Sequence, residues 1–252
     1  MKKRHLRRWF LVFAALLALT SCRGDDGAPD VTGPSEATPI AIPSGTWLRV
    51  ANLSSDLNGS RVRLDGRIFR ERLSYPAVTG YQRIEPGSYR IVFVPPPKPR
   101  IDPRTVDLET IFDIGPENAV TIIASGLVVT RTLRVTAIQD DLAPSGERAR
   151  IRLINAMSDF PSPLGLWQNR RIALVRRVEY LEDAPYRNLD AGNYPLEVRR
   201  TGTTEAVVPV VPYGLARNAT YTMFAFGTLR REDFDARLVL DASEGVATQR
   251  AQ

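Results

Sequence analysis

The sequence is poor in the side chains that most hydrolases and metalloenzymes use. It contains one histidine, His5, and one cysteine, Cys22, and both lie within the first 22 of its 252 residues. The rest of the chain has no imidazole for acid–base catalysis, no His/Cys set for zinc and no thiol pair for a disulfide. We therefore expect no catalytic residues, no metal site and no cofactor. A pair of carboxylates is the common catalytic arrangement that the composition leaves open.

Lysine is also scarce, and the excess of positive charge is concentrated at the start of the chain. Five of the 34 Lys and Arg residues precede Cys22 and none of the 28 acidic residues does, so 29 basic and 28 acidic residues follow. Nucleic-acid binding needs clustered cations without acidic partners. We therefore expect no nucleic-acid partner, although the formal net charge of the whole chain is +6.

The apolar run at residues 10–19 is too short to cross a bilayer as a helix, because a hydrocarbon core of roughly 30 Å needs about 20 residues. It follows a basic segment without acidic residues, a pattern typical of a signal peptide. We predict a signal peptide at residues 1–21. Arg7-Arg8 also allows the twin-arginine export route, and the sequence does not choose between this route and general secretion.

Leu19-Thr20-Ser21-Cys22 resembles the lipobox of bacterial lipoproteins. The resemblance implies that Cys22 is the lipid attachment residue, that it carries diacylglyceryl and palmitate-type chains, and that it becomes the mature N-terminus. Such chains anchor a protein by about 0.8 kcal/mol per buried methylene. We expect a cell-envelope protein whose membrane contact is this anchor. Arg23 stands where an Asp favours inner-membrane retention, so the outer membrane is expected in a Gram-negative cell. An ordinary secretory leader with an incidental cysteine is the alternative.

Residues 22–44 are rich in Pro, Gly, Asp, Ser and Thr and show no hydrophobic periodicity. A segment of this composition does not bury enough apolar surface to fold. We predict a disordered tether between the anchor and the folded part.

Three stretches of the remaining chain occur twice, in the same order. Residues 47–56 align with 150–159, residues 81–93 with 186–198, and residues 120–126 with 221–227. The spacing between the copies stays near one hundred residues. We therefore predict two homologous domains, at residues 45–141 and 147–245, joined by the short polar segment 140–147.

Each copy has the sequence pattern of an all-β domain. Leu48-Arg49-Val50 and Ile151-Arg152-Leu153 alternate apolar and charged residues, which predicts strands with the arginines on a solvated face. Asp65-Gly66 suits a type I′ hairpin, and residues 119–123 suit a central strand. Only residues 175–182 could form a short helix. With about seven short strands per copy, we predict two tandem immunoglobulin-like antiparallel β-sandwiches of Greek-key type.

Proline-rich residues 95–103 predict a loop or a sheet edge, because proline does not donate to a strand ladder. A polyproline ligand for a partner is the alternative.

The repeated stretches resemble a bacterial domain-of-unknown-function family of secreted proteins and lipoproteins, often present as tandem immunoglobulin-like copies. Residues 155–161 and 166–169 carry the family's opening pattern in the second copy, and residues 52–56 and 62–66 carry it in the first. The family often has a histidine where Asn52 and Asn155 stand, so any role of that histidine is absent here. The resemblance implies a fold and no particular activity.

Four side chains are candidates for ligand binding. Asp56 and Asp159 follow equivalent strands, but one acid per copy is few for calcium, and a loop cap is the favoured interpretation. Trp47 and Trp167 could stack on a sugar ring, but packing in or beside a sandwich core is favoured. The other aromatics, including Tyr89, Tyr194, Phe224 and Phe226, are interpreted as core residues.

These observations predict a lipid-anchored, non-catalytic envelope protein that serves as a scaffold or binding module. Its expected partners are the membrane, through Cys22, and another envelope protein or a polysaccharide. The ligand-binding residues are not identified by the sequence. The alternative functions are a carbohydrate-binding surface protein and, with less support, a carboxylate-based hydrolase.

Overall fold

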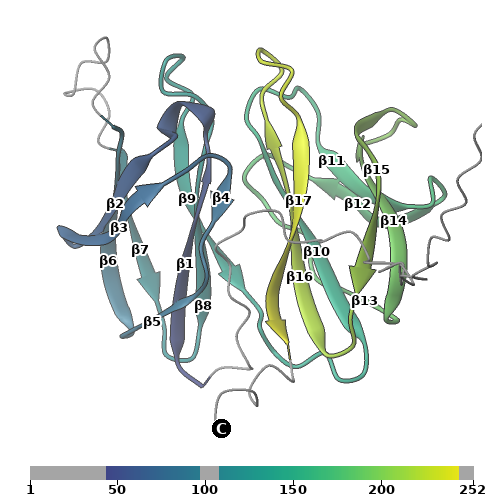
Figure 1. Cartoon of the computed structure of the whole chain (residues 1–252), viewed down its shortest axis with the longest axis horizontal. Helices are drawn as coiled ribbons and strands as arrows, with labels where there is room; N and C mark the ends of the chain where they lie inside the picture. The colour runs from purple at the N-terminus through teal and green to yellow at the C-terminus, as the bar shows by residue number, and fades with distance from the viewer. Residues whose placement is uncertain (1–43, 97–107, 244–252) are drawn as a thin grey trace, which may run out of the picture.

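The computed structural model describes residues 44–96 and 108–243, and these residues form an all-β fold of four sheets (Figure 1). The predicted signal peptide, Cys22, the tether and Pro97 to Pro103 lie outside the described residues. Two sheets belong to the N-terminal half, from Thr46 to Asp140, and two to the C-terminal half, from Ala149 to Ser243. The prediction of an all-β sandwich fold is confirmed.

The N-terminal half contains nine strands and one short 3₁₀ turn at Ser55–Leu57. The strands are β1 (Thr46–Leu53), β2 (Ser60–Leu64), β3 (Arg67–Leu73), β4 (Ala77–Val78), β5 (Gln82–Ile84), β6 (Gly87–Val94), β7 (Leu108–Ile114), β8 (Ala119–Ser125) and β9 (Arg134–Asp140). Its outer sheet has the order β3-β2-β6-β7. Its inner sheet has the order β4-β1-β8-β9, and β5 also pairs with β1.

The C-terminal half has the same arrangement. Its strands are β10 (Ala149–Met157), β11 (Leu164–Gln168), β12 (Ile172–Val178), β13 (Arg187–Leu189), β14 (Gly192–Arg200), β15 (Ala206–Leu215), β16 (Ala219–Gly227) and β17 (Asp235–Ser243). The outer sheet has the order β12-β11-β14-β15 and the inner sheet the order β13-β10-β16-β17. The three repeated stretches therefore occupy corresponding strands: β1 and β10, β6 and β14, and β8 and β16.

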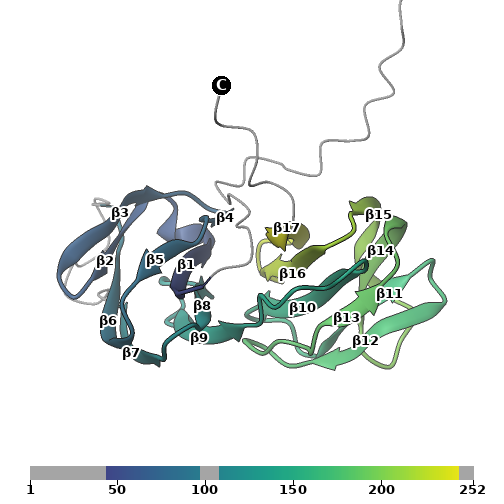
Figure 2. The same ribbon diagram turned by 90° about the horizontal axis from the view of Figure 1, so that it is seen from below.

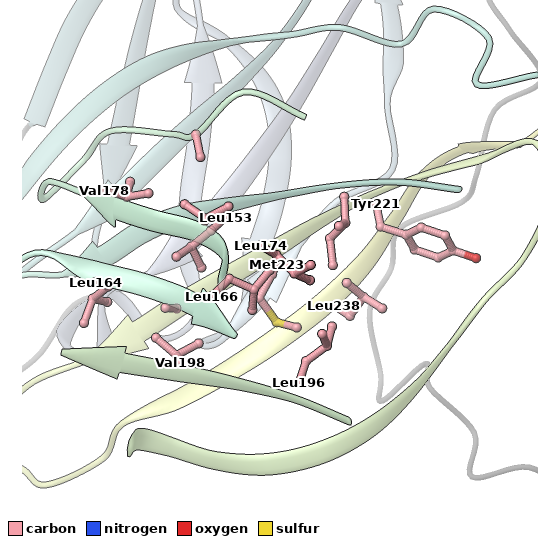
Figure 3. Close-up of a cluster of buried hydrophobic side chains, with 14 of the residues drawn as sticks. Leu153, Leu164, Leu166, Leu174, Val178, Leu196, Val198, Tyr221, Met223 and Leu238 are labelled. Atoms are coloured by element: carbon pink, nitrogen blue, oxygen red, sulfur yellow. The ribbon is translucent and has the colours of Figure 1, made fainter. Parts of the chain in front are cut away.

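The four sheets are stacked, with the two inner sheets facing each other at the centre of the molecule (Figure 2). Each half has its own core between its outer and inner sheets. Figure 3 shows the C-terminal one, where Leu164, Leu166 and Val198 of the outer sheet meet Leu153, Met223 and Leu238 of the inner sheet.

A third cluster lies between the inner sheets and includes Ala51, Ile123, Ile154, Phe224 and Phe226. Phe224 and Phe226 are thus buried between the halves and not inside a sandwich, because they lie on the face of β16 that points away from the C-terminal core.

Each inner sheet has one parallel strand pair, which the expectation of antiparallel sheets did not include. β1 runs parallel to β8 from Trp47↔Ala119 to Leu53↔Ser125, and β10 runs parallel to β16. Every residue of β8, β10 and β16 is buried. Parallel strands are typical of sheets covered on both faces, and here one face is covered by the sandwich core and the other by the opposite half.

Local predictions are confirmed at the Asp65-Gly66 hairpin and wrong at residues 175–182. Asp65 and Gly66 adopt φ of 48° and 77°, as a type I′ turn requires, and link β2 to β3. Residues 175–178 instead complete β12, because Val175 and Val178 pack into the C-terminal core and pair with β11.

The predicted join at residues 140–147 also needs correction at its first residue. Asp140 is the last residue of β9 and its side chain is buried. It is buried because residues of the opposite half cover it, which no local pattern reveals.

Candidate functional site

The two inner sheets enclose a cluster of eight polar residues that occupy equivalent positions in the two halves. We call this cluster the inter-half network. It consists of Arg49, Tyr81, Thr121 and Asp140 from the N-terminal half, and Arg152, Tyr186, Thr222 and Asp241 from the C-terminal half. Arg49 is 0 % exposed and Arg152 is 1 % exposed. The prediction that these arginines lie on a solvated face is therefore wrong.

Hydrogen bonds within each half connect an arginine, a threonine and an aspartate in the same way. Nε of Arg49 donates to Oγ1 of Thr121 at 2.7 Å, and that hydroxyl donates to Oδ2 of Asp140 at 2.6 Å. In the C-terminal half the corresponding distances are 3.0 Å for Arg152 to Thr222 and 2.6 Å for Thr222 to Asp241. Each threonine hydroxyl thus serves as acceptor and donor at once.

The ion pairs cross between the halves. Nη1 of Arg49 donates to Oδ1 of Asp241 at 2.6 Å, and Nη2 of Arg152 donates to Oδ1 of Asp140. The tyrosines complete the inter-half network. The Tyr81 hydroxyl donates to Asp140 at 2.8 Å, and the Tyr186 hydroxyl donates to Asp241 at 3.1 Å. The two arginines and two aspartates carry no net charge together, and each aspartate accepts from an arginine of the opposite half.

The surroundings shift the pKa values of these groups in different directions. Burial alone would raise the pKa of Asp140, but Arg152 and Arg49 outweigh it and hold that pKa below its ordinary value. Burial, together with Asp140 and Asp241, raises the pKa of Tyr81 well above 10, and burial with the same two carboxylates does so for Tyr186. At neutral pH Asp140 is therefore ionised and both phenols are protonated.

This arrangement stabilises the contact between the halves and offers little to a substrate. The charged groups are buried and their hydrogen-bonding capacity is used by one another. Sequence reasoning missed the network because alternation of apolar and charged residues predicts a solvated face when the second sandwich is not considered. A usable signal was present, since Arg49 and Arg152, Thr121 and Thr222, and Tyr81 and Tyr186 all fall in the repeated stretches.

Asp56 and Asp159 cap loops, as the favoured interpretation expected. Asp56 accepts from the backbone N–H of Val129 at 3.1 Å and from Arg231 at 2.5 Å. Asp159 accepts from the N–H groups of Leu229 and Arg230 at 2.5 and 3.2 Å. Among residues 44–96 and 108–243, no group of three or more His, Cys, Asp or Glu residues is placed to hold a metal ion.

Asn52 and Asn155, at the positions where the family often has histidine, are buried and bonded to backbone. Nδ2 of Asn52 donates to the carbonyls of Leu57 and Leu73, at 3.0 and 3.2 Å. Nδ2 of Asn155 donates to the carbonyl of Val178 at 3.1 Å. Both side chains therefore fix the loops that leave β1 and β10.

The two candidate tryptophans have different environments, although both are half-buried. Trp167 lies on the outer C-terminal sheet, where the Arg199 guanidinium sits 4.8 Å from its ring centre. Trp47 packs beside Tyr81, Ala119 and Leu142 at the base of the contact between the halves. Sequence reasoning weighed the two equally, and the structure separates them.

Trp47 lines an open pocket of about 440 Å³, which we call the Trp47 pocket. The remaining walls come from the turn before β8, the end of β9 and the segment after it: Glu117, Asn118, Ala119, Gln139, Asp140, Asp141, Leu142 and Ala143. Small-molecule sites commonly have about 300–1000 Å³. The sequence indicated Trp47 alone, because the other residues come together only through the pairing of β1, β8 and β9.

Comparison with known proteins gives one match, which covers part of the chain. Residues 46–162 match a family described as "Domain of unknown function (DUF4397)". A DUF4397 domain is present. The match starts at the first residue of β1 and runs through β10, so the DUF4397 region includes both the Trp47 pocket and Arg152 of the network. No curated protein matches the chain.

The described residues include no helix that is long and apolar enough to cross a membrane.

Proposed function

We propose that the protein is a lipid-anchored, non-catalytic binding module of the bacterial cell envelope. In this proposal Cys22 carries the lipid, residues 22–44 form the tether, and the two halves are copies of one β-sandwich domain that act together as one rigid body. The shared strand order and the equivalent positions of the eight network residues support the duplication.

The inter-half network is the observation that carries the proposal of a rigid module. Removing one partner from a buried ion pair costs roughly 3–5 kcal/mol, and this contact contains two such pairs that cross between the halves. A surface built across both halves therefore keeps its shape when a partner binds. A surface that is already ordered loses less conformational entropy when it binds a partner.

The position of the loops agrees with a tethered module. The chain enters β1 at Thr46, at the lower end of the molecule in Figure 1. Because β8 and β16 run parallel to β1 and β10, the loops after Ser125 and Gly227 lie at the opposite end. These loops expose Val129 and Leu229, which are 67 % and 49 % accessible. The end far from the proposed anchor thus presents loops to a partner.

The carboxylates near the Trp47 pocket give little support to the hydrolase alternative. A glycosidase needs a carboxylic acid of raised pKa beside a second carboxylate, roughly 5–9.5 Å away. Burial alone would raise the pKa of Asp141, but its hydrogen bond from Arg150 lowers it, and the pKa of Asp140 is also lowered. Both acids are held ionised, which is unfavourable for a general acid.

Mass spectrometry of the protein purified from membranes tests the anchor. We expect a mature chain that begins at Cys22 and carries diacylglyceryl and acyl groups. Cys22→Ala should abolish both the lipid and the cleavage before residue 22, whereas Ser21→Ala should keep them, because alanine is also small. An unmodified Cys22 in the wild-type protein, or cleavage at another bond, would refute the anchor.

In-cell crosslinking from the loops after Ser125 and Gly227 tests the binding role. A photo-crosslinking residue at Val129 or Leu229 should capture a specific envelope component, while the same residue at Ile172, exposed on the outer C-terminal sheet, serves as control. Equal capture from all three positions would contradict a binding surface at the distal end.

A further inference from the structure

The Trp47 pocket has features of a ligand site that the inter-half network lacks. We infer that it binds a neutral saccharide, at the end of the molecule opposite the loops after Ser125 and Gly227, so that it is a second site beyond the proposed function. The pocket is open to solvent, has the volume of a small-molecule site and has the partly buried Trp47 among its lining residues.

Several polar side chains around the pocket have unused hydrogen-bonding capacity. Within the described part of the chain, Nε1 of Trp47 is buried without a hydrogen-bond partner. The side chains of Glu117, Asn118 and Gln139 also make no hydrogen bond or ion pair to described residues. The accessible donors and acceptors of Glu117, Asn118 and Gln139 are therefore available to a ligand in the pocket.

The charge of the lining argues for a neutral ligand. The lining contains no lysine or arginine, which disfavours phosphate, sulfate and carboxylate groups. Asp140 is paired with Arg152, and Asp141 accepts from Arg150 at 2.5 Å. Glu117 therefore remains as the carboxylate free to accept hydrogen bonds from hydroxyl or amide groups of the ligand.

A pyranose ring matches this combination of groups. Its axial C–H bonds form an apolar face that packs on an aromatic ring, and its equatorial hydroxyls surround that face with donors and acceptors. The indole of Trp47 supplies the apolar surface. Glu117, Asn118 and Gln139 supply an acceptor and two amides at the border. An all-equatorial sugar such as a β-1,4-linked glucose or N-acetylglucosamine oligomer has the longest uninterrupted apolar face.

The C-terminal half lacks an equivalent site. Strand register places Arg150 at the position of Trp47 and Leu240 at the position of Gln139, and Ala219 corresponds to Asn118. The apolar ring and both amides are thus replaced in the second copy. The pocket is a specialisation of the N-terminal half and not a by-product of the repeated fold.

Titration of the full-length protein in detergent micelles with cellotriose and chitotriose, measured by isothermal titration calorimetry, tests the inference. We expect saturable binding of at least one trisaccharide and no binding of polygalacturonate, which is anionic. Trp47→Ala should weaken binding at least tenfold. Gln139→Leu, which introduces the residue of the C-terminal half, should weaken it about three- to tenfold, by loss of a hydrogen bond. Trp167→Phe is the control and should bind as the wild-type protein does.

Trp47→Phe keeps the inference testable if Trp47→Ala does not fold. It retains an aromatic face of smaller area, so we expect intermediate affinity. Absence of saturable binding of both trisaccharides, or equal binding by wild type and a folded Trp47 variant, would overturn the saccharide site. Either result leaves the mass of the Cys22 peptide unchanged, so failure of this inference is distinguishable from failure of the anchor.

Discussion

The two halves of the molecule share their buried polar contacts and differ in what surrounds them. Arg49 and Arg152 bond to equivalent threonines and to aspartates of the opposite half. Arg152 has two further acceptors, Asp183 and the carbonyl of Gln139, each at 3.0 Å. Both guanidiniums lie over the equivalent tyrosine ring, Arg49 at 4.5 Å from the ring centre of Tyr81 and Arg152 at 4.8 Å from that of Tyr186. The contacts that each half makes in the network are therefore nearly the same, while the neighbouring surface differs, with Trp47 in one half and Arg150 in the other.

Replacing one network arginine should have the largest effect on stability. We expect Arg49→Met and Arg152→Met each to lower the free energy of unfolding by about 3–5 kcal/mol, because a fully buried aspartate of the opposite half loses its cross-half arginine. Urea denaturation of the full-length protein measures this. The unfolding transition should also separate into two, since the halves no longer stabilise each other.

Arg61→Met is the control for this prediction. Arg61 pairs with Glu71 on the surface, at 2.9 Å, and such exposed pairs contribute about 0–1 kcal/mol. If the network variants lost no more stability than Arg61→Met, the inter-half network would not be what joins the halves.

The buried asparagines offer a second comparison, with a smaller effect. Asn52 donates to two carbonyls and Asn155 to one, and each accepts from a backbone N–H two residues later, at 3.1 Å. Each buried group left unsatisfied costs roughly 1–3 kcal/mol. Asn52→Ala should therefore destabilise the protein by about 1–3 kcal/mol more than Asn155→Ala. Equal losses would show that the additional carbonyl is satisfied in another way.

The sequence was sufficient for the fold class and for several local features, because each of these depends on neighbouring residues. The existence of the strands, the Asp65-Gly66 turn and the central strand at residues 119–123 were predicted from local pattern and confirmed. The burial of Arg49 and Arg152 was not predictable in this way, because it depends on a second sandwich about one hundred residues away. The same holds for the Trp47 pocket, whose walls meet only after β1 has paired with β8.

The inter-half network should make the stability of the protein fall at both acidic and alkaline pH. The pKa of Asp140 is lowered in the folded state, so the unfolded chain binds this proton first as the pH falls. Stability is then complete above the ordinary pKa of about 3.9 and is lost as the pH falls through the folded value. The pKa values of Tyr81 and Tyr186 are raised, so above pH 10 the unfolded chain ionises first and stability falls.

Each titrating group should contribute a slope of up to about 1.4 kcal/mol per pH unit. Urea denaturation between pH 3 and 11 measures the free energy of unfolding across both the acidic and the alkaline limb of its pH profile. Tyr81→Phe has no phenol to ionise, so we expect a shallower alkaline limb than in the wild-type protein. An alkaline limb of unchanged slope in this variant would assign the loss of stability to other groups.

The smallest expected effect concerns two tyrosines that begin β6 and β14. The Tyr89 hydroxyl donates to the carbonyl of Glu85 at 2.6 Å, and the Tyr194 hydroxyl donates to the carbonyl of Asp190 at 2.7 Å. Both bonds close a turn four residues back, a geometry known as the tyrosine corner in β-sandwiches. Tyr89→Phe and Tyr194→Phe should each cost about 0.5–1.5 kcal/mol. Because the corners share no partner, the double variant should lose the sum. Unequal losses, or a double variant that is not additive, would mean that the two corners are not independent copies of one element, and the proposal of duplication would then rest on the shared strand order and the network.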